Sequence, residues 1–331
     1  MLLADDAIGI LVLALIVDRA IGDPHWLWSR LRHPVAIFGV AISWLDLQLN
    51  RPGLAGTTAR RNGFIAIIVL AAASAAAGIA LHILLQGVRF GWLAEVLLVA
   101  IMLAQKSLLD HVRRVSHALR ENGLEAGRKE VAKIVGRNTE QMAETDVARA
   151  SIESVAENFS DGTMAPALWY LACGLPGVLV YKMVNTADSM IGHKSEKYLQ
   201  FGFASARLDD VLNFVPARIS AALVALAAPC RRGSIKKAFE VIGHDAPEHV
   251  SPNAGWPEAA MAGALHIALG GPRRYGSQTL QAAWINPAGE RTLSAADVDN
   301  AIGLVEVAWA VFTSTLAVAF VLTVSANIES C

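Results

Sequence analysis

Long apolar runs constrain the fold of this chain more than any other feature of its sequence. A helix that crosses a bilayer needs about 20 predominantly apolar residues. Runs at 64–86, 90–109 and 304–324 satisfy this requirement, and a shorter run covers 7–17. The composition agrees, because 54% of the 331 residues are hydrophobic and only 17% are charged. We therefore expect a polytopic membrane protein.

Two further apolar stretches, at 163–184 and 211–229, contain residues that break helices. The first includes Gly-Leu-Pro-Gly at 174–177, and the second includes Asn213 and Pro216. Irregular backbone at membrane depth is tolerated where protein or a watery cavity covers it. We therefore expect an all-α fold with about four to six apolar segments. The two broken stretches should form a re-entrant pair or a buried helical hairpin.

The distribution of Lys and Arg sets the expected orientation. Six lie in 18–62, nine in 106–162 and seven in 231–303, and the positive-inside rule places segments rich in these residues in the cytoplasm. The net charge of −1, with no long basic block, excludes a protein that coats nucleic acid. The loop 185–210 faces inside if the broken stretches are re-entrant and outside if both cross fully.

The expected organisation is one membrane-embedded domain over residues 1–331. Cytoplasmic polar segments should cover 110–162, which we expect to be helical, and 230–303. Within the latter, residues 294–303 should form a helix capped by Ser294. The three cysteines show no CxxC spacing, which excludes a cysteine-based zinc site and a disulfide scaffold.

The first candidate site lies at 148–162. Arg149, Glu153 and Glu157 are spaced by four residues, so they share one helix face, and this helix should end near Asp161, just before a broken stretch. Such a stripe is commonly a solvated row of ion pairs. Its position also suits Mg²⁺, which favours one or two carboxylates together with phosphate oxygens and water. Glu153, Glu157 and Asp161 are therefore candidate magnesium ligands.

The second candidate site lies between the two broken stretches. Ionisable groups near membrane depth are costly, so they indicate function, although an ordinary interfacial loop is the alternative. Acids suit metal binding, and Lys and Arg suit phosphoryl oxygens. Neither a Walker-type nor a Rossmann fingerprint is present. The polar residues of this site are Lys182, Asn185, Asp188, His193, Lys194, Lys197, Arg207, Asp209 and Asp210.

The third candidate site is the turn and helix start at 251–265. Asn253 and Trp256 lie in or beside the turn, Pro257 is suited to the start of a helix, and Glu258 falls in the first helical turn. A helix N-terminus is a ready anion site. The alternative is a turn that merely packs a helix of small residues.

These stretches resemble the CobD/CbiB family of cobalamin biosynthesis, the adenosylcobinamide-phosphate synthases. The resemblance extends from Asp18 to about Gly276. Phe159 stands where a small polar or β-branched residue is expected, and His193 where an aromatic residue is expected, but neither change removes a charge. The runs that carry the resemblance are Ser-Val-Ala-Glu-Asn at 154–158 with Asp161-Gly162, Asn185-Thr186 with Asp188-Ser189-Met190 and Gly192, Ala-Ser-Ala-Arg-Leu-Asp-Asp at 204–210, and Ser-Pro-Asn-Ala-Gly-Trp-Pro-Glu-Ala-Ala-Met-Ala-Gly at 251–263.

The resemblance implies a carbon–nitrogen ligase in the bacterial inner membrane, with its active face in the cytoplasm. Such an enzyme joins a carboxylate of adenosylcobyric acid to aminopropanol or its O-phosphate and yields adenosylcobinamide or its phosphate. A carboxylate does not condense with an amine at neutral pH without activation, so ATP and Mg²⁺ are the expected cofactors. The implied partners are the corrinoid, the amine, the lipid bilayer and other membrane-bound enzymes of cobalamin assembly.

Candidate roles follow from this implied chemistry. An imidazole exchanges protons near neutral pH, so His193 is a candidate base. The candidate catalytic residues are Asp188, His193, Glu157, Asp209 and Asp210. The candidate substrate-binding residues are Asn158, Asn185, Lys182, Lys194, Lys197, Arg207, Asn253, Trp256 and Glu258.

Two other function classes remain open from the sequence. A membrane transporter is the main alternative, because helices interrupted by Gly and Pro beside charges are typical of transporters. The chain shows no repeated halves, which argues against this class. A scaffold for other corrinoid enzymes, without catalysis of its own, is the third class. It predicts that Asp188→Ala and Glu157→Ala leave cobinamide formation intact.

Overall fold

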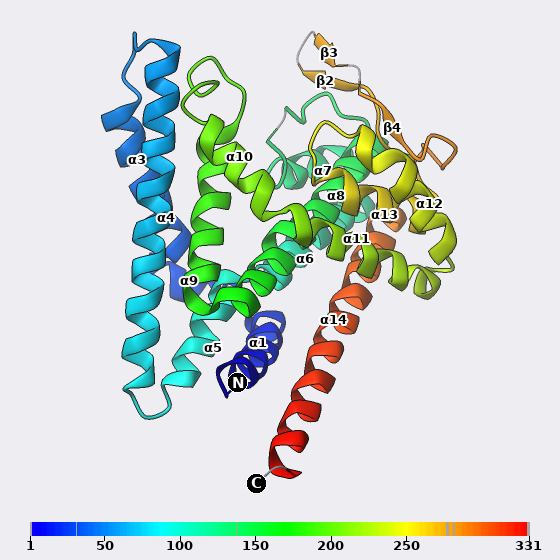
Figure 1. Ribbon diagram of the computed structural model, residues 1–331. Coiled ribbons are helices and arrows are strands. Elements are labelled where there is room, and N and C mark those ends of the chain that lie inside the picture. The colour runs from blue at the N-terminus through cyan, green and yellow to red at the C-terminus, as the bar shows by residue number, and fades with distance from the viewer. Residues whose placement is uncertain (1, 31, 137, 276–277, 281, 330–331) are drawn as a thin grey trace. The chain divides into compact units, whose positions relative to one another are not determined.

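The computed structural model describes residues 2–30, 32–136, 138–275, 278–280 and 282–329. These residues form mainly α-helices, with short π-helical and 3₁₀ turns and four strands of two or three residues (Figure 1). Five helical stretches of the described chain are long and apolar enough to cross a membrane: Gly56–Gln86, Gly91–Asn122, Glu144–Gly192, Phe214–Arg231 and Ala295–Asn327. The expected fold class, an all-helical polytopic membrane protein, is confirmed.

The chain divides into two compact units, which are described separately. Unit 1 comprises residues 1–104, 165–213 and 316–331, and unit 2 comprises residues 105–164 and 214–315. Both expected polar segments, 110–162 and 230–303, fall within unit 2.

The helices of unit 1 include the apolar runs near the N-terminus and the first broken stretch. They are α1 (Leu2–Ile21), α2 (His25–Trp28), α3 (Pro34–Leu49), α4 (Gly56–Gln86), α5 (Gly91–Met102), α9 (Ala165–Ala187), the π-helical turn η3 (Asp188–Gly192) and α10 (Phe203–Leu212). The last helix of the chain, α14 (Ala295–Glu329), contributes its C-terminal part to unit 1.

The elements of unit 2 are shorter. They are α6 (Gln105–His117), η1 (Ala118–Asn122), α7 (Leu124–Val131), α8 (Glu144–Phe159), η2 (Ser160–Met164), α11 (Phe214–Ala227), η4 (Ala228–Arg231), α12 (Ile235–Asp245), η5 (Ala246–Glu248), α13 (Gly255–Leu265), β1 (Leu269–Gly270), β2 (Arg273–Tyr275), β3 (Gln278–Leu280), β4 (Trp284–Ile285) and the N-terminal part of α14. Strands β1 and β4 pair antiparallel, as do β2 and β3.

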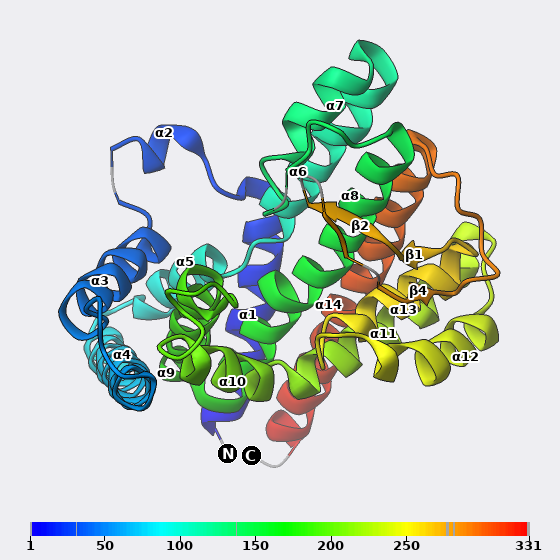
Figure 2. The ribbon, with the colours of Figure 1, turned by 90° about the horizontal axis from the view of Figure 1, so that it is seen from above.

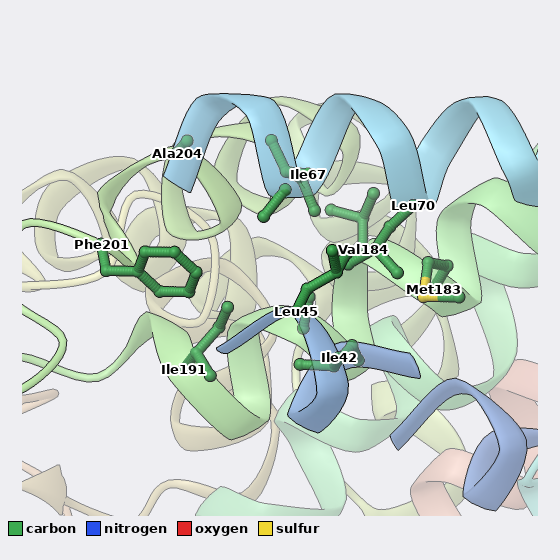
Figure 3. Close-up of a cluster of buried hydrophobic side chains, with 11 residues drawn as sticks. Ile42, Leu45, Ile67, Leu70, Met183, Val184, Ile191, Phe201 and Ala204 are labelled. Atoms are coloured by element: carbon green, nitrogen blue, oxygen red, sulfur yellow. The ribbon is translucent and has the colours of Figure 1, made fainter. Parts of the chain in front are cut away.

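The core of unit 1 lies where α3, α4 and α9 run side by side (Figures 1 and 2). Ile42 and Leu45 of α3 meet Ile67 of α4 and Val184 of α9, and Phe201 covers one end of the cluster (Figure 3). On α4, small residues such as Gly63 and Ala66 are buried together with Ile67 and Leu70, while other large apolar residues point outward. This division suits a helix in lipid, where small residues allow backbones to approach closely.

Two glycines of α4 sit at such close approaches. A β-carbon at Gly63 would collide with the carbonyl oxygen of Phe201, and one at Gly78 would collide with the backbone of Pro176. The outward side of the same helix carries exposed residues such as Ile68 and Leu84. The sequence of α4 therefore fixes both its protein-facing and its lipid-facing sides.

The expected break in the first irregular stretch is present inside α9. Gly174 has φ +63° and ψ −152°, outside the helical region, two residues before Pro176. Glycine accepts this positive φ without steric cost. The second stretch is interrupted at Asn213, between α10 and α11. The re-entrant arrangement of the two stretches remains a prediction.

Three expectations about helix boundaries are corrected. The helix at 148–162 does not end near Asp161, because α8 continues through η2 directly into α9. Residues 110–162 are not one helix, since α7 and α8 are separated by a non-helical segment, 132–143. The cap at Ser294 is confirmed, with its backbone N–H and hydroxyl donating to Asp297 Oδ2 at 2.8 and 2.9 Å, but the helix that it starts continues to Glu329.

Candidate functional site

The predicted site residues fall into two groups, one in each unit. The unit 1 group comes from α9, η3, the 193–202 loop and α10 and consists of Lys182, Asn185, Asp188, His193, Lys194, Lys197, Arg207, Asp209 and Asp210. The unit 2 group comes from α8, η2 and the start of α13 and consists of Glu153, Glu157, Asn158, Asp161, Asn253, Trp256 and Glu258.

Asp209 is the centre of a buried hydrogen-bond network in unit 1. Its carboxylate is 9% exposed and accepts one bond from Asn185 Nδ2 at 3.2 Å and another from Asn213 Nδ2 at 2.9 Å. Tyr181 donates its hydroxyl to Asn213 Oδ1 at 2.9 Å, so the network joins α9 to the end of α10. Each carboxylate oxygen thus has one neutral amide partner.

Burial raises the pKa of Asp209 from 3.8 to about 6. The two amide hydrogen bonds oppose this rise, and the negative charge of Asp210 adds to it. A carboxyl group whose pKa approaches neutrality can both hold and release a proton under physiological conditions. Asp209 is therefore the described residue of this group best suited to proton transfer.

Asp210 lies beside two exposed cations. Its Oδ2 forms an ion pair with Arg207 Nη1 at 3.2 Å, and the charge of Lys194 also acts on it. Burial raises the pKa of Asp210, and the two cations lower it. Arg207 and Lys194 are exposed, so they present positive charge to solvent next to the Asp209 network. The functional role of these acids and cations stays a prediction.

Three other predicted residues of unit 1 lie close by in the chain but have different settings. Asp188 opens η3, and its carboxylate packs over Gly192, where a β-carbon would collide with it. His193 is exposed, and its ring meets Tyr198 edge-on with 4.9 Å between centroids. Lys182 is half-buried on α9.

Lys197 occupies a structural position rather than an open one. Its Nζ lies 2.6 Å from Oδ2 of the buried Asp46 and 2.8 Å from the Tyr198 hydroxyl. Asn50 supports the same carboxylate by donating to its other oxygen at 2.9 Å. The hydrogen bond to Asp46 raises the pKa of Lys197. This cluster fastens the 193–202 loop to α3, which gives Lys197 a role other than the predicted one in phosphate binding.

Two of the three charged residues on the predicted face of α8, Arg149 and Glu153, are buried, so this part of the face is not a solvated row of ion pairs. Arg149 is 8% exposed and donates to the backbone oxygens of Arg291 at 2.7 Å and Ala268 at 3.4 Å. Glu153 Oε1 accepts the backbone N–H of Gly270 at 2.8 Å. Both side chains therefore tie α8 to the segments around β1 and β4, and one oxygen of the candidate magnesium ligand Glu153 is already engaged.

The remaining candidates on α8 and η2 are more accessible. Glu157 and Asn158 are exposed, and Asn158 Nδ2 donates to the backbone oxygen of Ser154 at 2.9 Å. Asp161 is half-buried. Across the described residues, no three His, Cys, Asp or Glu side chains converge to hold a metal ion by themselves. A magnesium ion here would need oxygens from substrate phosphate and water, which is its usual mode of binding.

The first turn of α13 also holds a buried acid. Glu258 is 3% exposed, and its Oε2 lies 3.7 Å from His249 Nε2. Asn253 is also buried, while Trp256 is half-buried against Arg218 of α11, 4.2 Å from guanidinium carbon to ring centroid. The expected start of a helix near Pro257 is confirmed, since α13 begins at Gly255.

Sequence reasoning missed several residues of these clusters. Asn213 follows Asp209 by four residues, a helical spacing that signals contact, and Tyr181 is a hydroxyl inside an apolar run that needs a partner. Arg218 is the single charged residue of the apolar stretch 211–229. His249 carries no such local signal, because its contact with Glu258 depends on the turn between them. Cys173 and Cys230 are exposed free thiols, and Cys331 lies outside the described residues.

Comparison with known proteins places the chain in a family. The family model described as CobD/Cbib protein matches residues 11–305. The chain belongs to the CobD/Cbib family. Curated relatives named cobalamin biosynthesis protein CobD are 54% identical in Sinorhizobium fredii (89% of this chain, 91% of the relative), 51% in Rhizobium meliloti (94% and 96%) and 41% in Rhodobacter capsulatus (83% and 86%). No solved structure matches the chain.

Membership of the CobD/Cbib family supports a role in cobalamin biosynthesis over the transporter alternative. All of these CobD relatives are named for biosynthesis, and the matched region includes every candidate site residue of both units. The family match runs from within α1 to the first part of α14, so it includes both polar clusters and the apolar segments between these two points.

Proposed function

We propose that this protein forms the amide bond between adenosylcobyric acid and aminopropanol or its O-phosphate, giving adenosylcobinamide or its phosphate. Family membership supports the coarse part of this proposal, a step in cobalamin biosynthesis. The single observation that carries the finer part is the buried Asp209 network, with its raised pKa and its two exposed cationic neighbours.

Asp209 acts as the proton acceptor in this proposal. An amine is protonated at neutral pH and attacks a carboxyl carbon only after it loses a proton. With a pKa of about 6, Asp209 is largely ionised at neutral pH and still basic enough to accept a proton. Asn185 and Asn213 orient the carboxylate without adding charge, so they keep both of its oxygens fixed for this task.

Lys194 and Arg207 bind phosphoryl oxygens in this proposal. A carboxylate must be activated before it forms an amide, and ATP supplies this activation by converting the carboxylate oxygen into a phosphorylated leaving group. Exposed cations stabilise the negative charge that develops in such a transfer. In unit 2, Glu157 and Asp161 stay candidate Mg²⁺ ligands, and a bound Mg²⁺ would offset phosphate charge.

The remaining partners follow from the same chemistry. Amide side chains such as Asn158, Asn185 and Asn253 can hydrogen-bond the amides around a corrinoid ring, and Trp256 offers an aromatic face. We place the protein in the bacterial inner membrane with these groups on the cytoplasmic side, because the segments rich in Lys and Arg flank them. Other membrane-bound enzymes of cobalamin assembly are the natural neighbours of such a protein.

A reconstituted reaction tests this proposal. The purified full chain is incubated in detergent with adenosylcobyric acid, ATP, Mg²⁺ and either amine, and the corrinoid products are separated and weighed by mass spectrometry. We expect an amide product with at least one amine. Asp209→Asn should lower its rate by about 100-fold or more, the usual contribution of a positioned acid or base.

The matched control is Glu240→Gln, which removes an exposed acid of α12 that lies outside both candidate groups. It should leave the rate within twofold of the parent chain. Absence of an amide product with both amines would refute the proposed function. A rate for Asp209→Asn equal to that of the parent would refute the role given to Asp209.

A further inference from the structure

Arg218 is a charged residue in an apolar helix, and its guanidinium is held by aromatic rings. The guanidinium carbon lies 3.5 Å from the ring centroid of Phe214 and 4.2 Å from that of Trp256. Its Nη1 donates to the backbone oxygen of Phe214 at 2.6 Å and to Oδ1 of the buried Asn253 at 3.3 Å. These contacts join α11 to the turn before α13 and fix the position of the positive charge.

This arginine lacks the carboxylate partner that comparable arginines have. In unit 2, Arg113 pairs with Glu306 and Arg149 pairs with Asp146. Within the part of the chain that the structure describes, no acidic side chain lies within ion-pair distance of Arg218. The acid on the first turn of α13, Glu258, faces His249 instead. A half-buried cation without a counter-ion is costly, so an anion at this point would lower its free energy.

The geometry leaves one edge of Arg218 for such an anion. Aromatic rings contact the guanidinium plane, and both hydrogen bonds of the described residues use Nη1. The N–H groups of Nε and Nη2 point along the edge that remains, and this edge matches two oxygens of a phosphate or carboxylate. Trp256 is the second residue of α13, so the positive end of that helix dipole lies at the same place.

We propose that Arg218, Asn253 and Trp256 form a binding site for a phosphate group, and that this group is the O-phosphate of the amine substrate. The second half of the statement rests on the proposed function. A phosphate is favoured over a carboxylate because its higher charge and third oxygen use the α13 N-terminus as well as the Arg218 edge. The headgroup of an anionic lipid also carries a phosphate. It is the other possible source of this group, because Phe214 and Val215 beside Arg218 are exposed apolar residues.

A binding measurement tests the site without relying on catalysis. Inorganic phosphate and aminopropanol O-phosphate are titrated into the purified full chain in detergent, and Trp fluorescence is followed, because the Trp256 ring contacts the proposed anion-binding residue. Arg218→Gln should weaken binding of both probes by about 10- to 100-fold, the range expected for charge-assisted hydrogen bonds. Arg218→Lys keeps the positive charge but lacks the two parallel N–H donors of a guanidinium, so it should restore only part of the phosphate affinity.

The matched control is Lys236→Gln, which removes a surface cation of the same unit whose side chain is 88% exposed. It should leave phosphate affinity unchanged. Melting temperatures of all variants show whether each one folds. If Arg218→Gln does not fold, the phosphate affinity of Arg218→Lys tests the site in its place. Equal phosphate affinity in the parent and in a folded Arg218→Gln or Arg218→Lys chain would overturn the site.

Two further arms separate the sources of the phosphate. In the first, melting temperatures are compared in nanodiscs of phosphatidylglycerol and of phosphatidylcholine. If the anionic lipid raises the melting temperature only when Arg218 is present, and aminopropanol O-phosphate does not bind, the substrate assignment is overturned in favour of a lipid headgroup. In the amide-forming assay, Arg218→Gln should raise KM at least tenfold more for the phosphorylated amine than for the free amine. An equal effect on both would also overturn the assignment. If neither amine reacts, the proposed function fails, while the phosphate titration still decides whether the site exists.

Discussion

Asp209 in unit 1 and Arg149 in unit 2 are both buried ionisable side chains, but they bond different kinds of partner. Arg149 donates to the backbone oxygens of Ala268 and Arg291, which do not titrate, and it also pairs with Asp146 on its own helix. Asp209 accepts from the side-chain amides of Asn185 and Asn213, and its pKa is raised to about 6. The difference separates a charge that holds the fold from a charge that is available for chemistry.

The largest expected effect lies on the structural side of this comparison. Arg149→Leu removes the donor to two backbone oxygens and the partner of Asp146, so the free energy of unfolding should fall by about 3 kcal/mol. Thermal and denaturant unfolding in mixed micelles measures this loss. Arg114→Leu, at an exposed surface pair with Glu130, is the matched control and should change stability by less than about 0.5 kcal/mol. Equal free energies of unfolding for the two variants would contradict the structural role of Arg149.

The second prediction concerns the pH dependence of stability on the Asp209 side. Because the folded pKa of about 6 lies above the ordinary value of 3.8, the unfolded chain releases this proton first as pH rises. The stabilising contribution of the neutral carboxyl is therefore complete below about pH 3.8 and is lost as pH rises through about 6, a change of about 3 kcal/mol. Unfolding measured between pH 4 and 7 should show this fall in the parent chain.

The Asp209→Asn variant sharpens the test, since an amide does not titrate. Relative to the parent, it should gain stability as pH rises across the same interval, while activity is lost. A stability difference between parent and variant that stays constant from pH 4 to 7 would show that Asp209 titrates normally, and the contrast with Arg149 would then disappear.

The smallest expected effect distinguishes two lysines of the 193–202 loop. Lys197 is paired with Asp46, and its side chain is 56% exposed, so Lys197→Met should lower stability by less than about 1 kcal/mol. We expect KM for ATP in the amide-forming assay to change less than twofold in this variant. Lys194→Met, which removes an exposed cation beside Asp210, should raise KM for ATP about tenfold. Equal effects of the two substitutions would return Lys197 to the phosphate-binding group.

Local signals in the sequence predicted the elements but not the contacts between them. The apolar runs, the break at Gly174 and the cap at Ser294 depend on residues close together in the chain, and all three are present. Lys197 and Asp46 are 151 residues apart, and Glu153 and Gly270 are 117 residues apart, so no local pattern indicates that they meet. Spacing correctly placed Glu153 on the face of Arg149, but spacing does not tell a solvated face from a buried one.

The same limit applies to the candidate site. The sequence analysis grouped the acids and cations of 182–213 into one candidate site, because polar residues between two apolar stretches are easily recognised in a sequence. It did not distinguish Asp209 from Asp210, which are adjacent in the chain yet differ in burial and partners. That distinction depends on α9, from which Asn185 donates to Asp209 and Tyr181 donates to Asn213, contacts that form only after the chain has folded back on itself.

The close approach of Gly63 to the carbonyl of Phe201 links the membrane helix α4 to the segment that carries the candidate chemistry. Phe201 lies two residues before the start of α10, which presents Arg207 and Asp209. Any side chain at position 63 would push this segment outward, although Gly63 touches no proposed substrate group. A genetic screen for loss of cobalamin production should therefore recover substitutions of this buried helix glycine in the same phenotypic class as substitutions of the proposed proton acceptor.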